Sequence, residues 1–495
     1  MKKILVLAAV LALAGGVAYA NFCARDYVPA ATLLVPYVVV GMTGNTPDPA
    51  GYTTLLAVTN VSSAKQIIHV VVWDAQSGSV VDFDEVLSGY DVWTINFRDL
   101  LTGSFNLFDT GDSEKPFKDN GSGPKPLVVP PLPQIGDFWV GTLGTAAVPY
   151  GPTSNSYTTA LPQPQDIDYP TPSIASCFFP YGSLPGVGAA VISALQAAIE
   201  PLDQNLTVEG CKTGTVASPP YLSGLTDNPL FFYATVDVVT QCNQNFPNDS
   251  GYWEPTSGIP FPTANNVLIG DIIYLNATHN FSESVPAVSI EADFDWASAT
   301  HHGFYSNYTS AFTTPYNDFH EPLATAFGFR YYNSGGVSSN VMVWKNQLDI
   351  VTVGGVDYAN ACRPYVYYAF DENENSKARG GGGPSGFNTA EPNLLPYQTQ
   401  KVPLDVTTWN ALMANNGWMM LVFDPSVPAH APLEPSTAVG VQAWVGVQYY
   451  FAGYSTALEA ATLGNVWCFP TDILPNLNSY VGVANGLLNA APTAP

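Results

Sequence analysis

Asp91–Phe97 reads DVWTINF and carries the clearest structural signal in the chain. Trp93, Ile95 and Phe97 recur at every second position, with smaller or polar residues between them. Alternate side chains of an extended strand point to the same face. The pattern therefore predicts a β-strand that buries three large apolar side chains on one face.

Other strand-like segments lie on both sides of this one and are separated by short polar turns. Such regularly spaced strands are typical of β-sandwiches. The sequence therefore predicts a mainly β protein with two β-sandwich (Ig-like) modules. The segments are Ala31–Met42, Thr53–Thr59, Gln66–Trp73, Ser79–Leu87, Leu230–Val239, Val267–Leu275, Val288–Phe294, Ala324–Tyr332, Asn340–Trp344, Tyr365–Phe370, Trp418–Phe423 and Ala443–Phe451.

Composition changes along the chain and suggests boundaries. Residues 102–168 are dense in Pro, Gly, Asp and Ser, which favours long loops. Beyond them, Ile192, Leu195 and Ile199 follow a helical spacing within 188–199, and we interpret this stripe as core packing. We expect a signal peptide at 1–20, an N-terminal sandwich at 21–130, a loop-rich β region with this short helix at 131–310, and a C-terminal sandwich at 311–495. We also expect a flexible loop at Arg379–Gly386.

Two segments far apart in the sequence have a similar pattern. Leu56–Asn60 leads to a strand ending at Trp73, and Phe327–Asn333 leads to a strand ending at Trp344. Two related sandwich modules would produce this similarity, and so would chance likeness between two pairs of strands.

The N-terminus has the three parts of a bacterial secretory signal. Lys2 and Lys3 precede an apolar run over 4–17, and Ala18-Tyr19-Ala20 supplies small residues at the two positions read by a signal peptidase. Cys23 lies three residues after the expected cut, so we expect no lipid anchor. We expect a secreted, extracellular or cell-surface protein, with the periplasm as the alternative.

Composition limits the classes of partner. Only 11% of residues are charged, and the formal net charge is −25. An acidic chain without a basic patch is a poor ligand for nucleic acid or for anionic membranes. No segment after the signal has the length and apolarity of a membrane helix. We therefore expect no nucleic acid and no membrane span.

The even number of cysteines in an exported chain predicts three disulfides. Sequence alone leaves their pairing open. The candidates are Cys23, Cys177, Cys211, Cys242, Cys362 and Cys468.

Several motifs together resemble a group of uncharacterised secreted bacterial β-rich proteins. The resemblance covers most of the chain after the signal and implies secretion and a shared fold, with no activity or site residue to carry over. The matching segments are 28–37 (VPAATLLVPY), 53–60 (TTLLAVTN), 82–84 (DFD), 87–99 (LSGYDVWTINFRD), 246–252 (FPNDSGY) and 330–333 (RYYN).

The sequence contains few motifs that indicate a catalytic or metal-binding site. There is no G-x-S-x-G elbow and no H-E-x-x-H motif, so we assign no catalytic residue. We interpret His301 and His302, near His279, Glu291, Asp293 and Asp295, as loop or surface histidines. We expect no cofactor; the alternative is a structural calcium ion in one of two acidic loops, formed by Asp109, Asp112, Glu114 and Asp119 or by residues 371–375.

The leading hypothesis is a non-enzymatic structural or cell-surface protein, with a self-assembling filament subunit as its specific form. Pro36 interrupts its first apolar segment, and because proline cannot donate to a β-ladder we expect an edge strand or a terminal arm there. Such an arm could complete a neighbouring copy's sheet, or it could simply be the first strand of its own sandwich. The candidate arm residues are Leu33, Leu34, Val35, Tyr37, Val38, Val39 and Val40.

Two alternatives remain. The first is a carbohydrate-binding or adhesive protein, with Tyr365, Tyr367 and Tyr368, or Tyr449 and Tyr450, as a binding strip. The second is a secreted hydrolase, which would need two close carboxylates. We expect partners to be further copies, other surface proteins or glycans.

Overall fold

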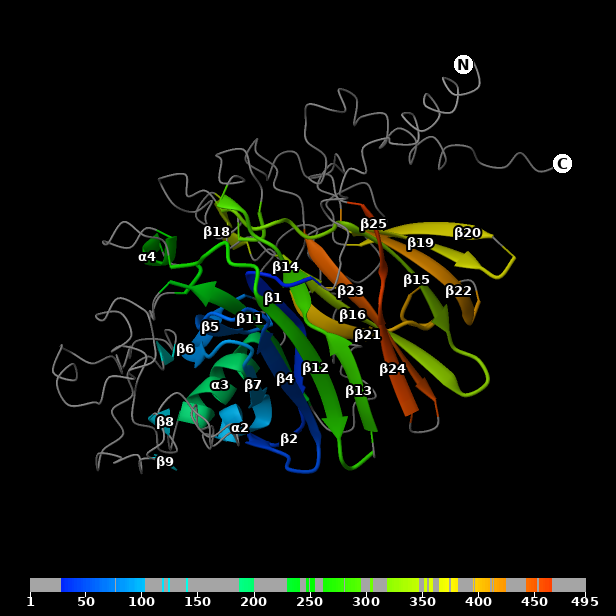
Figure 1. Ribbon diagram of the computed structural model, residues 1–495. Coiled ribbons are helices and arrows are strands. Elements are labelled where there is room, and N and C mark those ends of the chain that lie inside the picture. Colours follow the sequence, from blue (N-terminus) through cyan, green and yellow to red (C-terminus); the bar gives the residue numbers. More distant parts are fainter. Residues whose placement is uncertain are drawn as a thin grey trace, which may run out of the picture.

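β-branched and aromatic residues form most of the strands, as their fit to a pleated, half-buried surface favours. A computed structural model describes the architecture (Figure 1). The described residues are 28–75, 77–102, 118–119, 123–124, 139–140, 187–199, 229–240, 246–248, 250–253, 261–279, 281–294, 303–305, 318–346, 351–353, 356–358, 365–373, 375–381, 395, 397–409, 412, 414–423, 442–451 and 454–464.

The chain is mainly β, as the sequence predicts, and its strands form several antiparallel sheets. The N-terminal half holds a six-stranded sheet in the order β10-β6-β5-β11-β1-β14 and a four-stranded sheet in the order β13-β12-β4-β7. Their bounds are β1 Thr32–Val40, β4 Tyr52–Asn60, β5 Gln66–Trp73, β6 Ser79–Leu87, β7 Val92–Asn96, β10 Trp139–Val140, β11 Leu230–Val239, β12 Leu268–Asn276, β13 Phe281–Pro286 and β14 Val288–Ile290.

The C-terminal half holds a five-stranded sheet in the order β20-β19-β22-β15-β25 and a four-stranded sheet in the order β21-β16-β23-β24. Their bounds are β15 Ala326–Tyr332, β16 Val337–Lys345, β19 Tyr365–Asp371, β20 Ser376–Gly381, β21 Thr399–Pro403, β22 Asn416–Val422, β23 Ala443–Phe451, β24 Tyr454–Glu459 and β25 Ala461–Gly464.

The remaining elements are short. The described helices are α2 Phe97–Thr102, α3 Val187–Ile199 and α4 Ser250–Trp253, and none has the length and hydropathy that a membrane span requires. Small strand pairs are β2 Met42–Thr43 with β3 Thr46–Pro47, β8 Lys118–Asp119 with β9 Gly123–Pro124, and β17 Val351–Val353 with β18 Val356–Tyr358.

The period-two prediction at the start of the sequence analysis is confirmed. Trp93, Ile95 and Phe97 are each at most 3% exposed, whereas Val92 is 51% exposed. Phe97 lies in α2 rather than in the strand. The predicted helix is α3, in which Ile192 and Leu195 are buried as expected of core packing.

The predicted boundary near residue 130 differs from the observed pairing. β11 lies between β5 and β1, and β12 pairs with β4, so strands from 131–310 complete both sheets of the N-terminal half. The pattern along the chain does not reveal this because the pairing joins residues about 200 positions apart, such as Thr32 and Asp237. The prediction of a loop at Arg379–Gly386 is also partly wrong, since Arg379 and the two following glycines pair with β19.

Pro36 is accommodated by a bulge rather than by an edge position. The pairing of β1 with β11 shifts register between Val35 and Val38, so no ladder hydrogen bond is required from Pro36. β1 is interior at its start, where Thr32–Leu34 pair with β11 on one side and β14 on the other. All nine residues of β1 are buried.

The two halves repeat one strand order. In the N-terminal half, β12-β4-β7 lie in one sheet and β6-β5-β11-β1 in the other. In the C-terminal half, β25-β15-β22 and β21-β16-β23-β24 take the corresponding places. The segments with the similar sequence pattern, β4–β5 and β15–β16, are at matching positions in the two halves.

One strand breaks the correspondence. Beside β23 lies β24, which follows it directly in the chain, whereas the matching place beside β11 is taken by β1 from the start of the chain. In the N-terminal half, the place beside β11 is therefore filled by a strand about 200 residues away in sequence, and β14 pairs with the start of that strand on its other side.

Candidate functional site

Polar side chains line one row of the six-stranded sheet. Asp84, His69, Asp237 and Thr32 are successive cross-strand neighbours on β6, β5, β11 and β1. Residues directly opposite one another in antiparallel strands share a face. All four are buried, so this row places two carboxylates and a histidine inside the protein.

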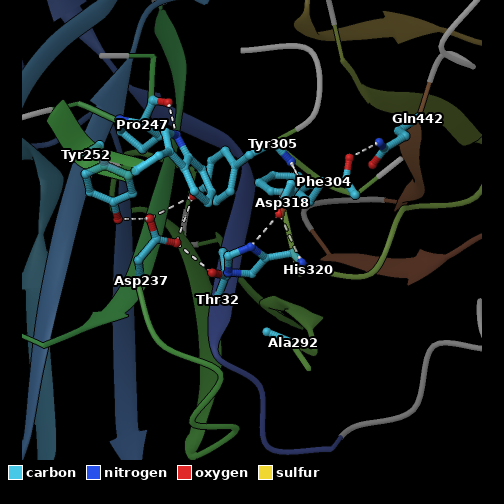
Figure 2. A network of polar contacts seen from close by, with 12 residues as sticks. Thr32, Asp237, Pro247, Tyr252, Ala292, Phe304, Tyr305, Asp318, His320 and Gln442 are labelled. Atoms are coloured by element: carbon cyan, nitrogen blue, oxygen red, sulfur yellow. Dashed lines mark hydrogen bonds and ion pairs between the residues drawn. The ribbon is translucent and has the colours of Figure 1, made fainter. Parts of the chain in front are cut away.

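Asp237 is the centre of the row. Its carboxylate accepts hydrogen bonds from Thr32 Oγ1 at 2.6 Å, Tyr252 Oη at 2.5 Å and Tyr305 Oη at 2.8 and 2.9 Å (Figure 2). Tyr252 lies in α4, and Tyr305 in a short segment of residues 303–305. Burial and the charge of Asp237 hold the pKa of Tyr252 well above its ordinary value of 10.0, so its hydroxyl remains a donor.

His69 lies between two carboxylates of β6. Its Nδ1 is 2.8 Å from Asp84 Oδ1, and its Nε2 is 3.8 Å from Asp82 Oδ2. The ring centroid is 5.6 Å from that of Tyr252. The side chains of all three ionisable residues of this group are at most 1% exposed.

A second histidine and carboxylate adjoin the first group. Asp318 Oδ1 is 2.8 Å from His320 Nδ1, and Asp318 Oδ2 accepts a hydrogen bond from the Tyr305 backbone at 2.6 Å. The rings of Trp253 and Tyr305 are each T-shaped relative to the His320 ring, with centroids 6.1 and 5.3 Å away. Tyr305 thus joins the two carboxylates, through its hydroxyl to one and its amide to the other.

Close packing fixes this segment. A Cβ added at Gly303 would lie 2.4 Å from Asp318 Oδ2 and 2.5 Å from the His320 carbonyl oxygen, so only glycine fits. The Gly303 carbonyl accepts a hydrogen bond from Gln442 Nε2 at 2.7 Å, and Gln442 Oε1 accepts one from the Leu323 amide at 2.9 Å. Gln442 directly precedes β23, so the network reaches the C-terminal half.

Aromatic rings continue the contact between the halves. Trp73 and Tyr233 stack with centroids 5.9 Å apart, and Tyr233 meets Trp344 edge to face at 5.8 Å. The Tyr233 hydroxyl accepts a hydrogen bond from the side-chain nitrogen of Gln398 at 3.2 Å. The backbone amide of Gln398 donates to the Ala75 carbonyl at 2.8 Å. The two tryptophans that end the similar sequence segments therefore meet around one tyrosine at the junction.

A second polar cluster lies at the same junction. Lys401 on β21 and Gln448 on β23 face Glu283 and Ser455, with Glu283 supplied by β13 of the N-terminal half. The Lys401 amine lies over two tyrosine rings, 5.9 Å from the centroid of Tyr37 on β1 and 5.6 Å from that of Tyr52 on β4. The cluster thus joins strands from both halves around one amine.

The side chains of these networks are mostly buried, and their hydrogen bonds hold them in one arrangement. Asp237 holds Tyr252 of α4 and Tyr305 against the sheet, and Asp318 joins Tyr305 to His320. Such buried hydrogen bonds rigidify this part of the fold.

Sequence analysis missed Asp237, His69 and Lys401. Asp237 and His69 each lie within a mainly apolar strand, which was a visible signal, whereas Lys401 lies in a polar strand that gave none.

The sequence-predicted site residues have different outcomes. All seven arm residues lie in β1 and are buried. Tyr367 is 1% exposed and does not belong to a surface strip, whereas Tyr450 is 37% exposed. The six cysteines, residues 1–20, His301, His302, Asp295, Asp109, Asp112 and Glu114 lie outside the described residues.

The second acidic loop is internally bonded. Asp371 accepts hydrogen bonds from the amides of Asn373 and Asn375 and from the Asn375 side chain, which lower the pKa of the carboxyl. Glu372 pairs with Arg330 at 2.8 Å. Within the part of the chain that the structure describes, no three His, Cys, Asp or Glu residues are arranged to hold a metal ion.

Compared with protein-family models, with curated proteins and with solved structures, the chain shows no significant match.

Proposed function

We propose that this chain is a secreted structural protein of the cell surface or extracellular space, which assembles with further copies of itself by exchange of β1. The position of β1 carries the proposal. It completes the sheet beside β11, where the matching place in the C-terminal half is filled by the local strand β24. Because β1 comes from the start of the chain, the place beside β11 can be filled by β1 of the same chain or by β1 of a neighbouring copy.

Two sandwich modules fit this role. β1 contacts β4 and β12, and β16 contacts β15, so each half brings its two sheets together. Pairing of β4 with β7 and of β5 with β11 corresponds to the B–E and C–F pairs of an Ig-like fold. In that comparison β1 takes the place of the last strand, which supports an exchange at this position.

The contacts of β1 would be the same in an exchanged assembly. Thr32 binds Asp237, Tyr37 stacks with Phe231 at 6.3 Å, and Thr399 Oγ1 donates to the Pro36 carbonyl at 2.5 Å. Exchange of an identical element forms no new interface, which makes it a low-cost route to oligomers. The turn between β1 and β4, residues 41–51, is the segment that must open.

Electron microscopy and light scattering of the purified chain test the proposal. We expect filaments or oligomers, and a peptide of residues 28–42 added during assembly should shorten them by occupying the place beside β11. A matched peptide carrying Leu34→Asp should have no effect, because that side chain is fully buried. A chain that remains monomeric at every concentration, with no filaments, would refute exchange.

Carbohydrate binding is the second candidate, because aromatic side chains gather on the outer face of the five-stranded sheet. Phe370 and Trp418 are cross-strand neighbours that stack with centroids 3.8 Å apart, and Trp418 is 40% exposed. Tyr332 on the same face is 44% exposed. Binding on a glycan array that disappears in Trp418→Ala would favour this function, and no binding by the native chain would oppose it.

The hydrolase alternative is less supported, since Asp237 and Asp318 are shielded from solvent. Secretion, three disulfides and a calcium ion near 109–119 stay predictions, because all the residues concerned except Asp119 lie outside the described part of the chain.

A further inference from the structure

A lysine and a glutamine lie side by side across the central strand of the junction-facing sheet. β16 pairs with β21 on one side and β23 on the other, with Lys401 opposite Met342 and Gln448 opposite Asn340. Positions 340 and 342 of a strand point to the same face. Both long side chains therefore reach over β16 on the face that meets the N-terminal half.

An amine, a carboxamide and a carboxyl group form a chain of contacts there. Lys401 Nζ donates to Gln448 Oε1 at 3.3 Å, and Gln448 Nε2 donates to Glu283 Oε1 at 2.6 Å. The other oxygen of Glu283 bonds Ser455. The carboxamide thus has a nucleophilic nitrogen beside its oxygen and an acid beside its nitrogen.

The surroundings favour the uncharged forms of both ionisable groups. Burial lowers the pKa of the Lys401 amine, partly opposed by the charge of Glu283. Burial also raises the pKa of Glu283, partly opposed by the Ser455 hydrogen bond, the charge of Lys401 and the Gln448 hydrogen bond. A neutral amine is a nucleophile, and a protonated carboxyl group can act as a general acid.

We propose that Lys401 and Gln448 join in an intramolecular isopeptide bond, with Glu283 as the catalytic acid and base. Lys401 Nζ attacks Gln448 Cδ, the bond between Cδ and Nε2 breaks, and Nε2 leaves as ammonia. Glu283 gives its proton to Nε2 and takes one from Nζ, so atoms and protons balance without an oxidant or cofactor. The amine contacts the oxygen of the carboxamide, and the carboxyl group contacts its nitrogen, which distinguishes this arrangement from an ordinary buried ion pair.

The bond would link β21 to β23 across β16 and so close a covalent loop within the C-terminal half. Glu283 comes from β13, and Tyr37 and Tyr52 over the amine come from β1 and β4. The N-terminal half therefore supplies the catalytic group and the apolar cover. Bond formation should consequently follow the docking of the two halves.

Mass spectrometry of the purified full chain tests this inference. We expect an intact mass lower by one ammonia after reduction of the cysteines, and a branched peptide joining residues 401 and 448 after chymotrypsin digestion. Both signals should be lost in Lys401→Arg and in Glu283→Gln. The control Glu372→Gln, in a side chain 54% exposed and paired with Arg330, should keep them.

The native chain decides whether the bond forms, and the Glu283→Gln variant decides the role of Glu283. A folded native chain without the branched peptide overturns the bond, and so does a mass that shows only conversion of Gln448 to glutamate. A branched peptide that persists in Glu283→Gln overturns the role of Glu283. Circular dichroism of each variant establishes that it is folded, and these readouts do not depend on whether the chain assembles into filaments.

Discussion

Replacement of Asp237 should be among the most damaging single changes in this protein. Asp237→Ala removes the acceptor for three buried hydroxyl groups, those of Thr32, Tyr252 and Tyr305. A buried donor left without a partner costs about 1–3 kcal/mol. The three together should reduce the free energy of unfolding by roughly 3–9 kcal/mol, a large part of the 5–15 kcal/mol typical of a folded protein.

Two further variants separate the hydrogen bonds from the volume of the side chain. Asp237→Asn keeps the shape and one acceptor oxygen, so it should cost only about 1–3 kcal/mol. Asp271→Asn changes an exposed carboxylate on β12 and should stay within about 0.5 kcal/mol of the native chain.

Urea unfolding followed by tryptophan fluorescence and far-ultraviolet circular dichroism measures these differences. Trp73 and Trp344 lie at the junction, so their fluorescence reports on the region that the network holds. A loss below about 1 kcal/mol in Asp237→Ala would show that the three hydroxyls find other partners and that the network does not hold the fold.

Three other predictions concern packing, pH and the face of a strand. Gly303→Ala should cost more than about 2 kcal/mol because its Cβ meets a carboxylate and a carbonyl oxygen, whereas Gly44→Ala, with open space and a φ of +62°, should cost about 1 kcal/mol in the same unfolding assay. Because the pKa of Glu283 is raised in the folded state, its contribution to stability is complete below the ordinary carboxyl pKa of 4.5 and is lost as the pH rises through the folded-state pKa. Urea unfolding measured from pH 4 upward should therefore show the native chain losing stability relative to Glu283→Gln. Parallel pH curves for the two proteins would contradict this. Ile95→Asp should prevent folding because it buries a charge, while Val92→Asp should be neutral within about 0.5 kcal/mol; equal effects in thermal unfolding would be inconsistent with the assigned face of β7.

Local sequence patterns determined the strands well where one face is buried. β5, β6, β11 and β23 have the bounds expected from their apolar runs, and β7 buries the face that its period of two indicates. β13, β21, β24 and β25 were not foreseen. Glu283 and Lys401, which lie in two of them, carry the charges that hide a strand pattern and that become favourable only against partners from the other half.

By itself the sequence determined the β class, the apolar first segment and the helix predicted at 188–199, because these depend on propensity and on periodicity within about ten neighbours. Only the tertiary structure decided that β1 completes a sheet with β11, that the two halves repeat one strand order, and that Lys401, Gln448 and Glu283 meet. Strand pairing over about 200 residues is selected by the free energy of the whole core, and no local pattern encodes which distant strand will be the partner.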